Sequence, residues 1–201
     1  MTRVDFFFDP VCPWCWITSR WLVEVSAHRD LEINWRTFSL RIKNRDLEMD
    51  EKYVKGHERG LRALRVVEAA RAEHGDSAVL PLYTEMGRRY HHDKDRDTDL
   101  GDVLEDAGYE RALASAADDD AWDAVIEASM KDALDLVGED TGVPIISFDG
   151  SAGFFGPVLS PAPTGEAAAQ LFDSLHAMAT LDGFWELKRT RTNPPIFAER
   201  P

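Results

Sequence analysis

The stretch from Val4 to Trp16 constrains the fold more than any other part of the chain. It joins a short apolar run, Val4 to Phe8, to the motif Cys12-Pro13-Trp14-Cys15, which holds both cysteines of the 201-residue chain. Asp9-Pro10 favours a turn after the run. Pro13 suits the first position of a helix, because the N–H that proline lacks would have no helical partner there. The stretch therefore predicts a buried strand, a tight turn and a helix that begins at a Cys-x-x-Cys pair.

This Cys-x-x-Cys pair has the spacing of a redox-active centre, in which the two cysteines form and break a disulfide bond. Cys12 lies where the free N–H groups and the dipole of the helix stabilise a thiolate, so we expect it to be the nucleophile. Cys15 lies one turn further in. We expect it to be the buried resolving thiol, which attacks a mixed disulfide on Cys12 and releases the reduced partner.

Two non-redox interpretations of the pair remain open. The cysteines would be structural if both were simply packed in the core. A zinc site would need about four ligands, and the sequence has no second Cys-x-x-Cys motif. His91 and His92 are adjacent, and we expect them to point apart on a helix and to face solvent. No metal is therefore expected.

The order of the remaining segments predicts a thioredoxin-like α/β fold. Leu31 to Phe38 alternates between apolar and polar residues, as in a half-buried strand, and the helix before it favours a parallel pair. Helical periodicity then runs from Asp46 to about Val137. Strand signals return in residues 143–148 and 153–156, and a helix is expected from Gly165 to Ala179. We expect a thioredoxin-like domain in residues 1–45 and 138–201, interrupted by an all-helical insertion in residues 46–137.

Val143-Pro144 is the second informative feature, because in thioredoxin-like folds a cis-proline precedes the third strand and faces the reactive cysteine. The alternative is a proline that begins an edge strand, and the sequence does not reveal the isomer. We expect Val143 and Pro144 to bind substrate together with Pro13 and Trp14. Trp14 lies between the cysteines and should be partly exposed, as an apolar wall for a flat substrate. Trp16 and Trp21 are expected in the core.

The charge and hydropathy of the chain exclude several classes of binding partner. The formal net charge of −14 argues against binding nucleic acid or an anionic membrane, since either needs a basic surface. No apolar run approaches the ~18 residues of a membrane helix, and the first residues do not resemble a secretory signal peptide. The cytoplasm is the expected compartment.

Two clusters of basic residues stand out in this acidic chain. One is Arg59, Arg62 and Arg65 on one predicted helix, and the other is the segment from Lys188 to Arg191. We expect the cluster of Arg59, Arg62 and Arg65 to form either an anion-binding site or a solvated helix face. We expect the segment from Lys188 to Arg191 to contact an acidic thiol cofactor or a partner subunit.

The stretch from Phe6 to Trp21 resembles the mycothiol-dependent nitroreductases, which are cytoplasmic DsbA-like proteins. Residues 137–144, 154–160 and 186–191 are also similar to this family, so the resemblance spans nearly the whole chain. It implies Cys12 as nucleophile, Cys15 as resolving thiol and Pro144 as the cis-proline. It also implies a dithiol regenerated by the small sugar thiol mycothiol, reduction of nitroaromatic compounds, and a homodimer with a mobile helical lid.

Three other functions stay open at this point. A general protein-disulfide oxidoreductase or isomerase would need exposed apolar surface for peptides. A DsbA-like isomerase of small aromatic substrates is disfavoured by Cys15, because such relatives often lack the second cysteine. A redox-sensing binding protein would use the disulfide only to move its helical segment.

Overall fold

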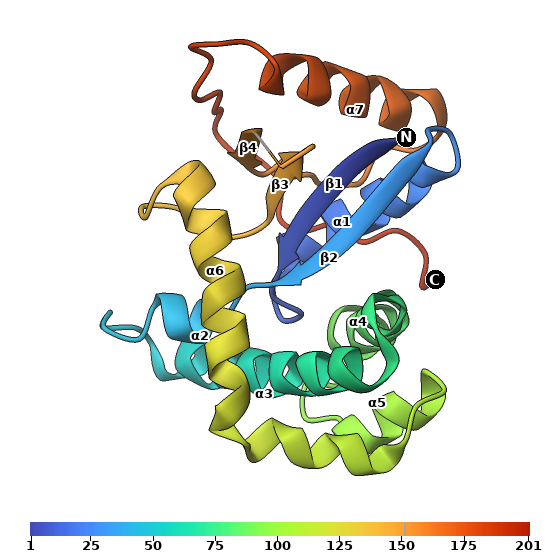
Figure 1. Cartoon of the computed structure of the whole chain (residues 1–201), viewed down its shortest axis with the longest axis vertical. Coiled ribbons are helices and arrows are strands. Elements are labelled where there is room, and N and C mark those ends of the chain that lie inside the picture. The colour runs from blue at the N-terminus through green and yellow to red at the C-terminus, as the bar shows by residue number, and fades with distance from the viewer. Residues whose placement is uncertain (151) are drawn as a thin grey trace.

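A computed structural model describes residues 1–150 and 152–201 of the chain (Figure 1). Its first three elements are β1 (Thr2–Phe8), α1 (Pro13–Ser26) and β2 (Leu31–Thr37). The two strands pair in parallel from Thr2 opposite Leu31 to Phe8 opposite Thr37. The predicted strand, helix and parallel strand are confirmed.

The second half of the sheet is the predicted antiparallel hairpin, β3 (Ile145–Phe148) and β4 (Ala152–Phe155). β3 pairs antiparallel with β1, which gives the order β2-β1-β3-β4. β3 begins two residues later than the apolar run predicts, because Pro144 has no N–H to donate to the ladder. The carbonyl oxygen of Pro144 still accepts the N–H of Gly156 at 2.7 Å.

Three helices cover the sheet. α1 packs against α7 (Gly165–Ala179), whose bounds match the prediction, and the indole N–H of Trp21 donates to the Ala168 carbonyl of α7 at 3.1 Å. α6 (Asp123–Val137) runs from the helical insertion up to the sheet, where it contacts β2, β3 and β4 (Figure 1). α6 therefore belongs to both parts of the molecule. The boundaries of the two expected domains stay a prediction.

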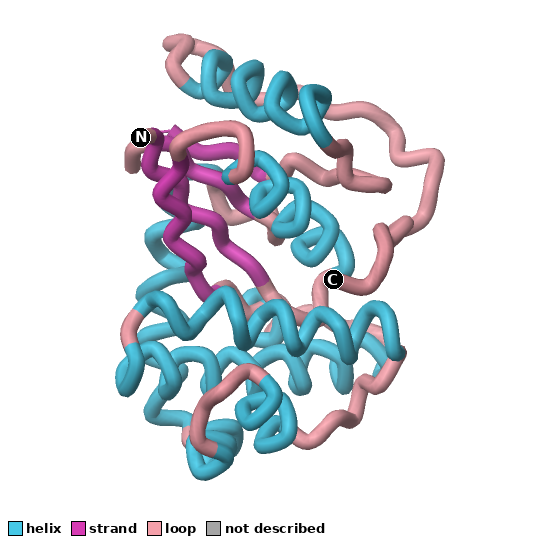
Figure 2. Tube along the Cα trace, turned by 90° about the vertical axis from the view of Figure 1, so that its right-hand side faces the viewer, coloured by secondary structure: helices cyan, strands magenta, loops and turns pink. Residues whose placement is uncertain are grey.

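The helical insertion lies at one end of the sheet (Figure 2). Besides α6, its elements are α3 (Glu51–His74), η1 (Asp76–Ala78), α4 (Val79–Gly87), η2 (Arg88–Asp93), α5 (Leu100–Asp106), η3 (Arg111–Asp118) and η4 (Asp120–Trp122). The short helix α2 (Leu40–Lys43) precedes the insertion and contacts α3. α2 lies before the stretch of predicted helical periodicity. Within that stretch, η3 is a 3₁₀ segment and not an α-helix. The helix α4, which begins at Val79, continues at Arg88 as the π-helical turn η2.

Aromatic rings join the insertion to the end of β1. Tyr83 of α4 is fully buried and stacks on Phe8, with ring centroids 3.9 Å apart and an interplanar angle of 21°. Its ring also lies 5.7 Å from that of Trp16 and 6.2 Å from that of Trp35. The core is therefore continuous from the sheet into the insertion, next to the strand end that leads to the cysteines.

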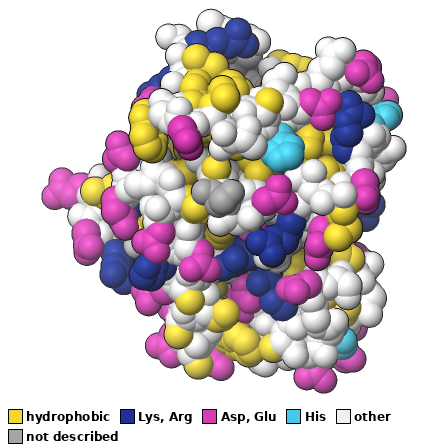
Figure 3. Space-filling model, turned by 45° about the horizontal axis from the view of Figure 1, so that its top comes forward, with side chains coloured by type: hydrophobic (Ala, Val, Ile, Leu, Met, Phe, Trp, Pro, Cys, Tyr) yellow, Lys and Arg dark blue, Asp and Glu magenta, His cyan; other side chains and the backbone are white. Residues whose placement is uncertain are grey.

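The surface combines charged and apolar areas. Figure 3 shows hydrophobic side chains exposed at the end of the molecule that carries α7. In the segment that follows α7, the side chains of Leu181, Trp185 and Leu187 have exposed fractions of 59%, 85% and 81%. Among the helices in the described part of the chain, none is both long and apolar enough to cross a membrane.

Candidate functional site

Both cysteines lie at the start of α1 as free thiols. Cys12 is the N-cap residue, and Pro13 occupies the first turn. The backbone N–H of Cys15 donates to Cys12 Sγ at 3.5 Å, and an N–H donor at a helix start stabilises negative charge on the sulfur it faces. The structure thus brings the two sulfurs together at the N-terminal end of the helix, as the sequence predicts.

The two thiols differ in their surroundings. Cys15 is completely buried, whereas Cys12 keeps a small exposed fraction of 6%. Burial raises the pKa of the Cys15 thiol well above its usual value, and the contact with Cys12 raises that pKa further. Cys15 is therefore protonated in the dithiol form. This asymmetry matches the expected roles, which stay predictions.

Val143 and Pro144 lie against the reactive end of α1. Their peptide bond is cis, and both residues are buried. The Cys12 thiol points at the carbonyl oxygen of Val143, with 3.8 Å between sulfur and oxygen. Val143, the residue before the predicted cis-proline, is thus brought to Cys12 across 131 positions in the sequence.

Trp14 is partly exposed, as expected, and its ring is covered by a cation. The guanidinium carbon of Arg191 lies 5.2 Å from the centre of the indole ring. Arg191 comes from the basic segment 188–191, so this segment reaches the cysteine pair. Trp16 and Trp21 are buried, with exposed fractions of 1% and 0%, which confirms their predicted place in the core.

The prediction for His91 and His92 is wrong, because both side chains contact Trp16 instead of facing solvent. The Trp16 indole N–H donates to His92 Nε2 at 3.0 Å, and the His91 ring stacks on the same indole with centroids 5.9 Å apart. His91 Nε2 also donates to the carbonyl oxygen of Pro10 at 2.9 Å. The π-helical turn η2 replaces the α-helical spacing on which the prediction relied. Hydrophobic periodicity alone does not reveal such a turn.

Burial favours the neutral form of both imidazoles. It lowers the pKa of His91 to about 4, against a smaller opposing effect of the Pro10 carbonyl. Burial also lowers the pKa of His92. Because His92 Nε2 accepts the indole proton, its own proton lies on Nδ1. The pair thus positions Trp16 and the Pro10 turn without adding charge beside the cysteines.

Asp9 is the site residue that the sequence analysis missed. Its side chain is fully buried. Oδ1 accepts the N–H of Val11 at 3.0 Å, and Oδ2 accepts the N–H of Leu40 at 2.8 Å. A Cβ on Gly60 would lie 2.5 Å from Oδ1, so α3 closes over this carboxyl group only because residue 60 is glycine. The signal was present in the sequence, as an acid at the end of an apolar strand and three residues before Cys12.

The carboxyl group of Asp9 titrates near neutral pH. Burial raises its pKa from 3.8 to about 7, and the two backbone N–H donors oppose this only in part. A hydrogen bond from the backbone N–H of Asp9 lowers the pKa of the Cys15 thiol, whereas the negative charge of the Asp9 carboxylate raises that pKa. Asp9 therefore connects the site electrostatically to α2 and α3.

No cluster of three or more His, Cys, Asp or Glu side chains that could hold a metal ion occurs in residues 1–150 and 152–201. The expectation that the protein needs no metal stays a prediction.

With the fold and the cysteine pair in place, comparison with known proteins decides the family. A family model described as Rv2466c-like, mycothiol-dependent nitroreductase Rv2466c, matches residues 11–189. The chain belongs to the Rv2466c-like family of mycothiol-dependent nitroreductases. It is therefore a thiol-disulfide oxidoreductase, and the resemblance seen in the sequence is confirmed.

A curated relative of this Rv2466c-like protein is the uncharacterized protein Rv2286c of Mycobacterium tuberculosis. The two chains are 32% identical over 196 residues, which cover 96% of this chain and 84% of the relative.

Solved structures confirm the DsbA-like thioredoxin fold. One is a probable DsbA oxidoreductase, SCO1869 from Streptomyces coelicolor, with a TM-score of 0.60 and 19% identity over 96% of this chain and 95% of that one. Another is the cytosolic disulfide reductase DsbM from Pseudomonas aeruginosa, with a TM-score of 0.56 and 18% identity over 87% of this chain and 99% of that one.

Proposed function

We propose that this protein is a mycothiol-linked dithiol reductase in which Cys12 is the nucleophile and Cys15 the resolving thiol. One observation carries the proposal: Cys12 caps the helix with its sulfur 3.5 Å from the Cys15 N–H, while Cys15 is fully buried and holds its proton. A small thiol can then reach one sulfur of the pair and not the other.

The proposed regeneration of the dithiol uses two molecules of mycothiol. In the disulfide form, Cys12 Sγ accepts the attack of one mycothiol thiolate, and the electron pair of the broken S–S bond goes to Cys15, which takes up a proton. The mixed disulfide on Cys12 is then cleaved by the second mycothiol thiolate. Cys12 leaves as a thiolate, and the products are mycothiol disulfide and the dithiol protein.

The proposed acceptor is a nitroaromatic compound. In a two-electron step the dithiol converts one nitro group to a nitroso group, and the two thiol protons leave with one nitro oxygen as water. Trp14 offers a partly exposed ring to the flat substrate, and Arg191 holds a guanidinium over the same ring, 5.2 Å from its centre, where it can donate to nitro oxygens. Pro13, Val143 and Pro144 complete the binding surface around Cys12.

The test is turnover of 4-nitrobenzoate by the reduced protein with mycothiol and a mycothiol-recycling system. We expect loss of turnover in Cys12→Ser. We expect the same loss in Cys15→Ser, because the two-electron step needs both thiols. Trp14→Ala should raise the KM for the nitro compound more than Trp14→Phe does.

Turnover that is unchanged in Cys12→Ser would contradict the proposal. A parallel assay with insulin disulfides separates it from general protein-disulfide reduction, which predicts insulin as the better substrate.

Cytoplasmic localisation and assembly as a homodimer stay predictions of the family resemblance. The exposed Trp185 and Leu187, beside the basic residues 188–191, are the surface that we expect a second copy to cover. Sedimentation of the protein with Trp185→Ser would test that assignment, because the variant should be monomeric at concentrations where the wild type is dimeric.

A further inference from the structure

A cavity of about 400 Å³ lies within the helical insertion, and the cysteine pair is not part of its lining. Its charged and polar walls come from α3, η2 and the loop before α5, and they include Arg59, Arg62, Tyr90, Arg96, Asp97 and Asp99. The volume falls in the range of small-molecule sites.

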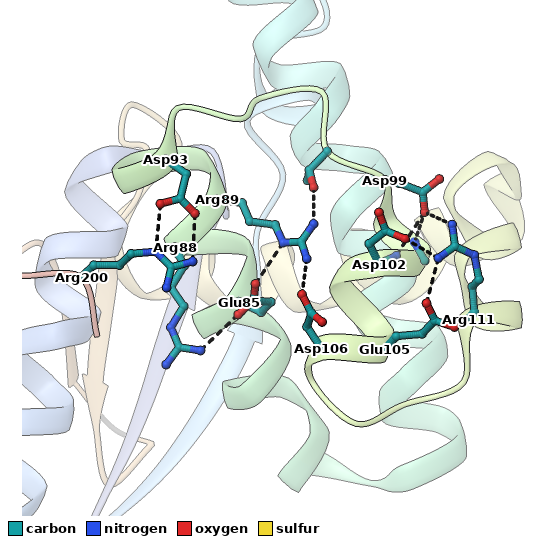
Figure 4. A network of polar contacts seen from close by, with 12 residues as sticks. Glu85, Arg88, Arg89, Asp93, Asp99, Asp102, Glu105, Asp106, Arg111 and Arg200 are labelled. Carbon is teal, nitrogen blue, oxygen red and sulfur yellow. Dashed lines mark hydrogen bonds and ion pairs between the residues drawn. The ribbon is translucent and has the colours of Figure 1, made fainter.

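The loop that forms one wall is held in place by three arginines from three different elements, and Figure 4 shows two of them, Arg89 and Arg111. Three consecutive residues of this loop each accept a hydrogen bond: Asp97 from Arg59 of α3 at 2.8 Å, Thr98 from Arg89 of η2 at 2.7 Å, and Asp99 from Arg111 of η3 at 2.9 Å. The wall is therefore fixed before any ligand arrives, which reduces the ordering cost of binding.

The hydrogen-bonding capacity left in the cavity consists mainly of donors. Both lining carboxylates already accept from arginines. Arg59 and Arg62 each use only one N–H on an acid, at 2.8 and 3.0 Å, whereas their neighbour Arg65 makes three hydrogen bonds. Arg96 has no carboxylate within ion-pair distance among the residues that the structure describes. Unused guanidinium donors favour an anion, and a carboxylate or phosphate matches their planar geometry.

The rest of the lining suits a ligand with an apolar body. Leu100, Ala114 and Ala117 supply aliphatic surface, and the mostly buried ring of Tyr90 supplies an aromatic edge. The residue after Tyr90 is His91, which donates to the Pro10 carbonyl. A ligand here would therefore touch the residue next to the one that contacts the Pro10 turn, without entering the cysteine site.

We propose that this cavity is a second binding site, which takes a small organic anion with a carboxylate or phosphate group held by Arg62 and Arg96. The site is independent of the proposed nitroreductase reaction, and its occupant is recognised by charge at one end and by apolar contact at the other.

The experiment is isothermal titration calorimetry of the whole protein at low salt with three probes that share one ring: benzoate, phenyl phosphate and uncharged benzyl alcohol. We expect saturable binding of at least one anion, weaker binding as sodium chloride is added, and none of benzyl alcohol. Comparing the two anions shows which group the site prefers. The double variant Arg62→Gln/Arg96→Gln should weaken the affinity about tenfold or more.

Two controls keep the test decisive. Arg29→Gln/Arg45→Gln removes the same charge from exposed arginines whose acidic partners lie outside the cavity, and it should bind as the wild type does. Arg96→Gln alone removes a side chain that bonds no acid, so it should fold normally and still bind more weakly. Absence of saturable anion binding, equal binding of benzyl alcohol, or an equal loss in the control variant would each overturn the proposal.

Discussion

Asp9→Asn should change how the stability of this protein depends on pH. The raised pKa of about 7 means that the folded protein binds a proton on Asp9 that the unfolded chain, with a pKa of 3.8, releases. Stability from this group is therefore complete below pH 3.8 and is lost as the pH rises through 7. The full effect is about 4 kcal/mol, from about three pKa units at about 1.4 kcal/mol each.

Between pH 5 and pH 8 the same linkage predicts that Asp9 lowers the free energy of unfolding by about 2.5 kcal/mol. Asn cannot titrate, so the variant should lack this part of the slope. Asn also presents N–H groups where a carboxyl oxygen now accepts the N–H of Val11 or Leu40, so one bond is lost at a cost of about 1–3 kcal/mol at every pH. The slope, and not the offset, is the test.

The assay is urea denaturation followed by tryptophan fluorescence at pH 5, 6, 7 and 8, with both cysteines kept reduced. The control is Asp5→Asn on the same strand, where Asp5 accepts a hydrogen bond from the side chain of Asn34 at 2.7 Å. We expect the control to keep the wild-type slope. If Asp9→Asn also keeps it, the carboxyl group of Asp9 is charged throughout this range, and the reasoning from burial is wrong.

Three further predictions concern packing, titration and ion pairing. Gly87→Ala should destabilise the protein by about 1–3 kcal/mol or more in urea denaturation, because its Cβ would lie 2.1 Å from the Trp16 ring. Gly56→Ala, with no atom within 4 Å of the new Cβ, should stabilise it by about 0.5–1 kcal/mol. An NMR titration should show His91 neutral at pH 5.5 and charging near pH 4, with stability lost as the pH falls from about 6.5 to about 4; a midpoint near 6.5 would contradict its burial. Arg65→Lys should cost about 1–2 kcal/mol, because lysine cannot make the paired bonds of 2.7 and 2.8 Å to Asp123, and unchanged stability would show that pair to be energetically neutral.

Local signals in the sequence were sufficient for the fold and for the centre of the site. Pro13 and the cysteine spacing located the start of α1, and the alternation of residues 31–38 located β2. Val143-Pro144 could be assigned because the order of elements places it beside the cysteines. Each of these features depends on neighbours in the chain or on a topology with few alternatives.

The parts that sequence reasoning missed depend on contacts between distant segments. The sequence predicts His91 and His92 at the surface, because the α-helical spacing places adjacent residues on different faces. The packing of the π-helical turn η2 on Trp16 changes that spacing, and no local pattern reveals it. Asp9 read as a turn residue. Its burial requires α3 to approach through Gly60 and α2 to donate the N–H of Leu40, and no local pattern records either contact.

α6 has a consequence for engineering this protein. The helix begins in the insertion and ends against β2, β3 and β4. Deletion of residues 46–137 would remove α6 from those strands and expose their apolar surface to water. A shortened or chimeric version should therefore keep residues 123–137 with the sheet. Exchange of the helical segment between relatives should succeed only when the junction lies before α6 and not after it.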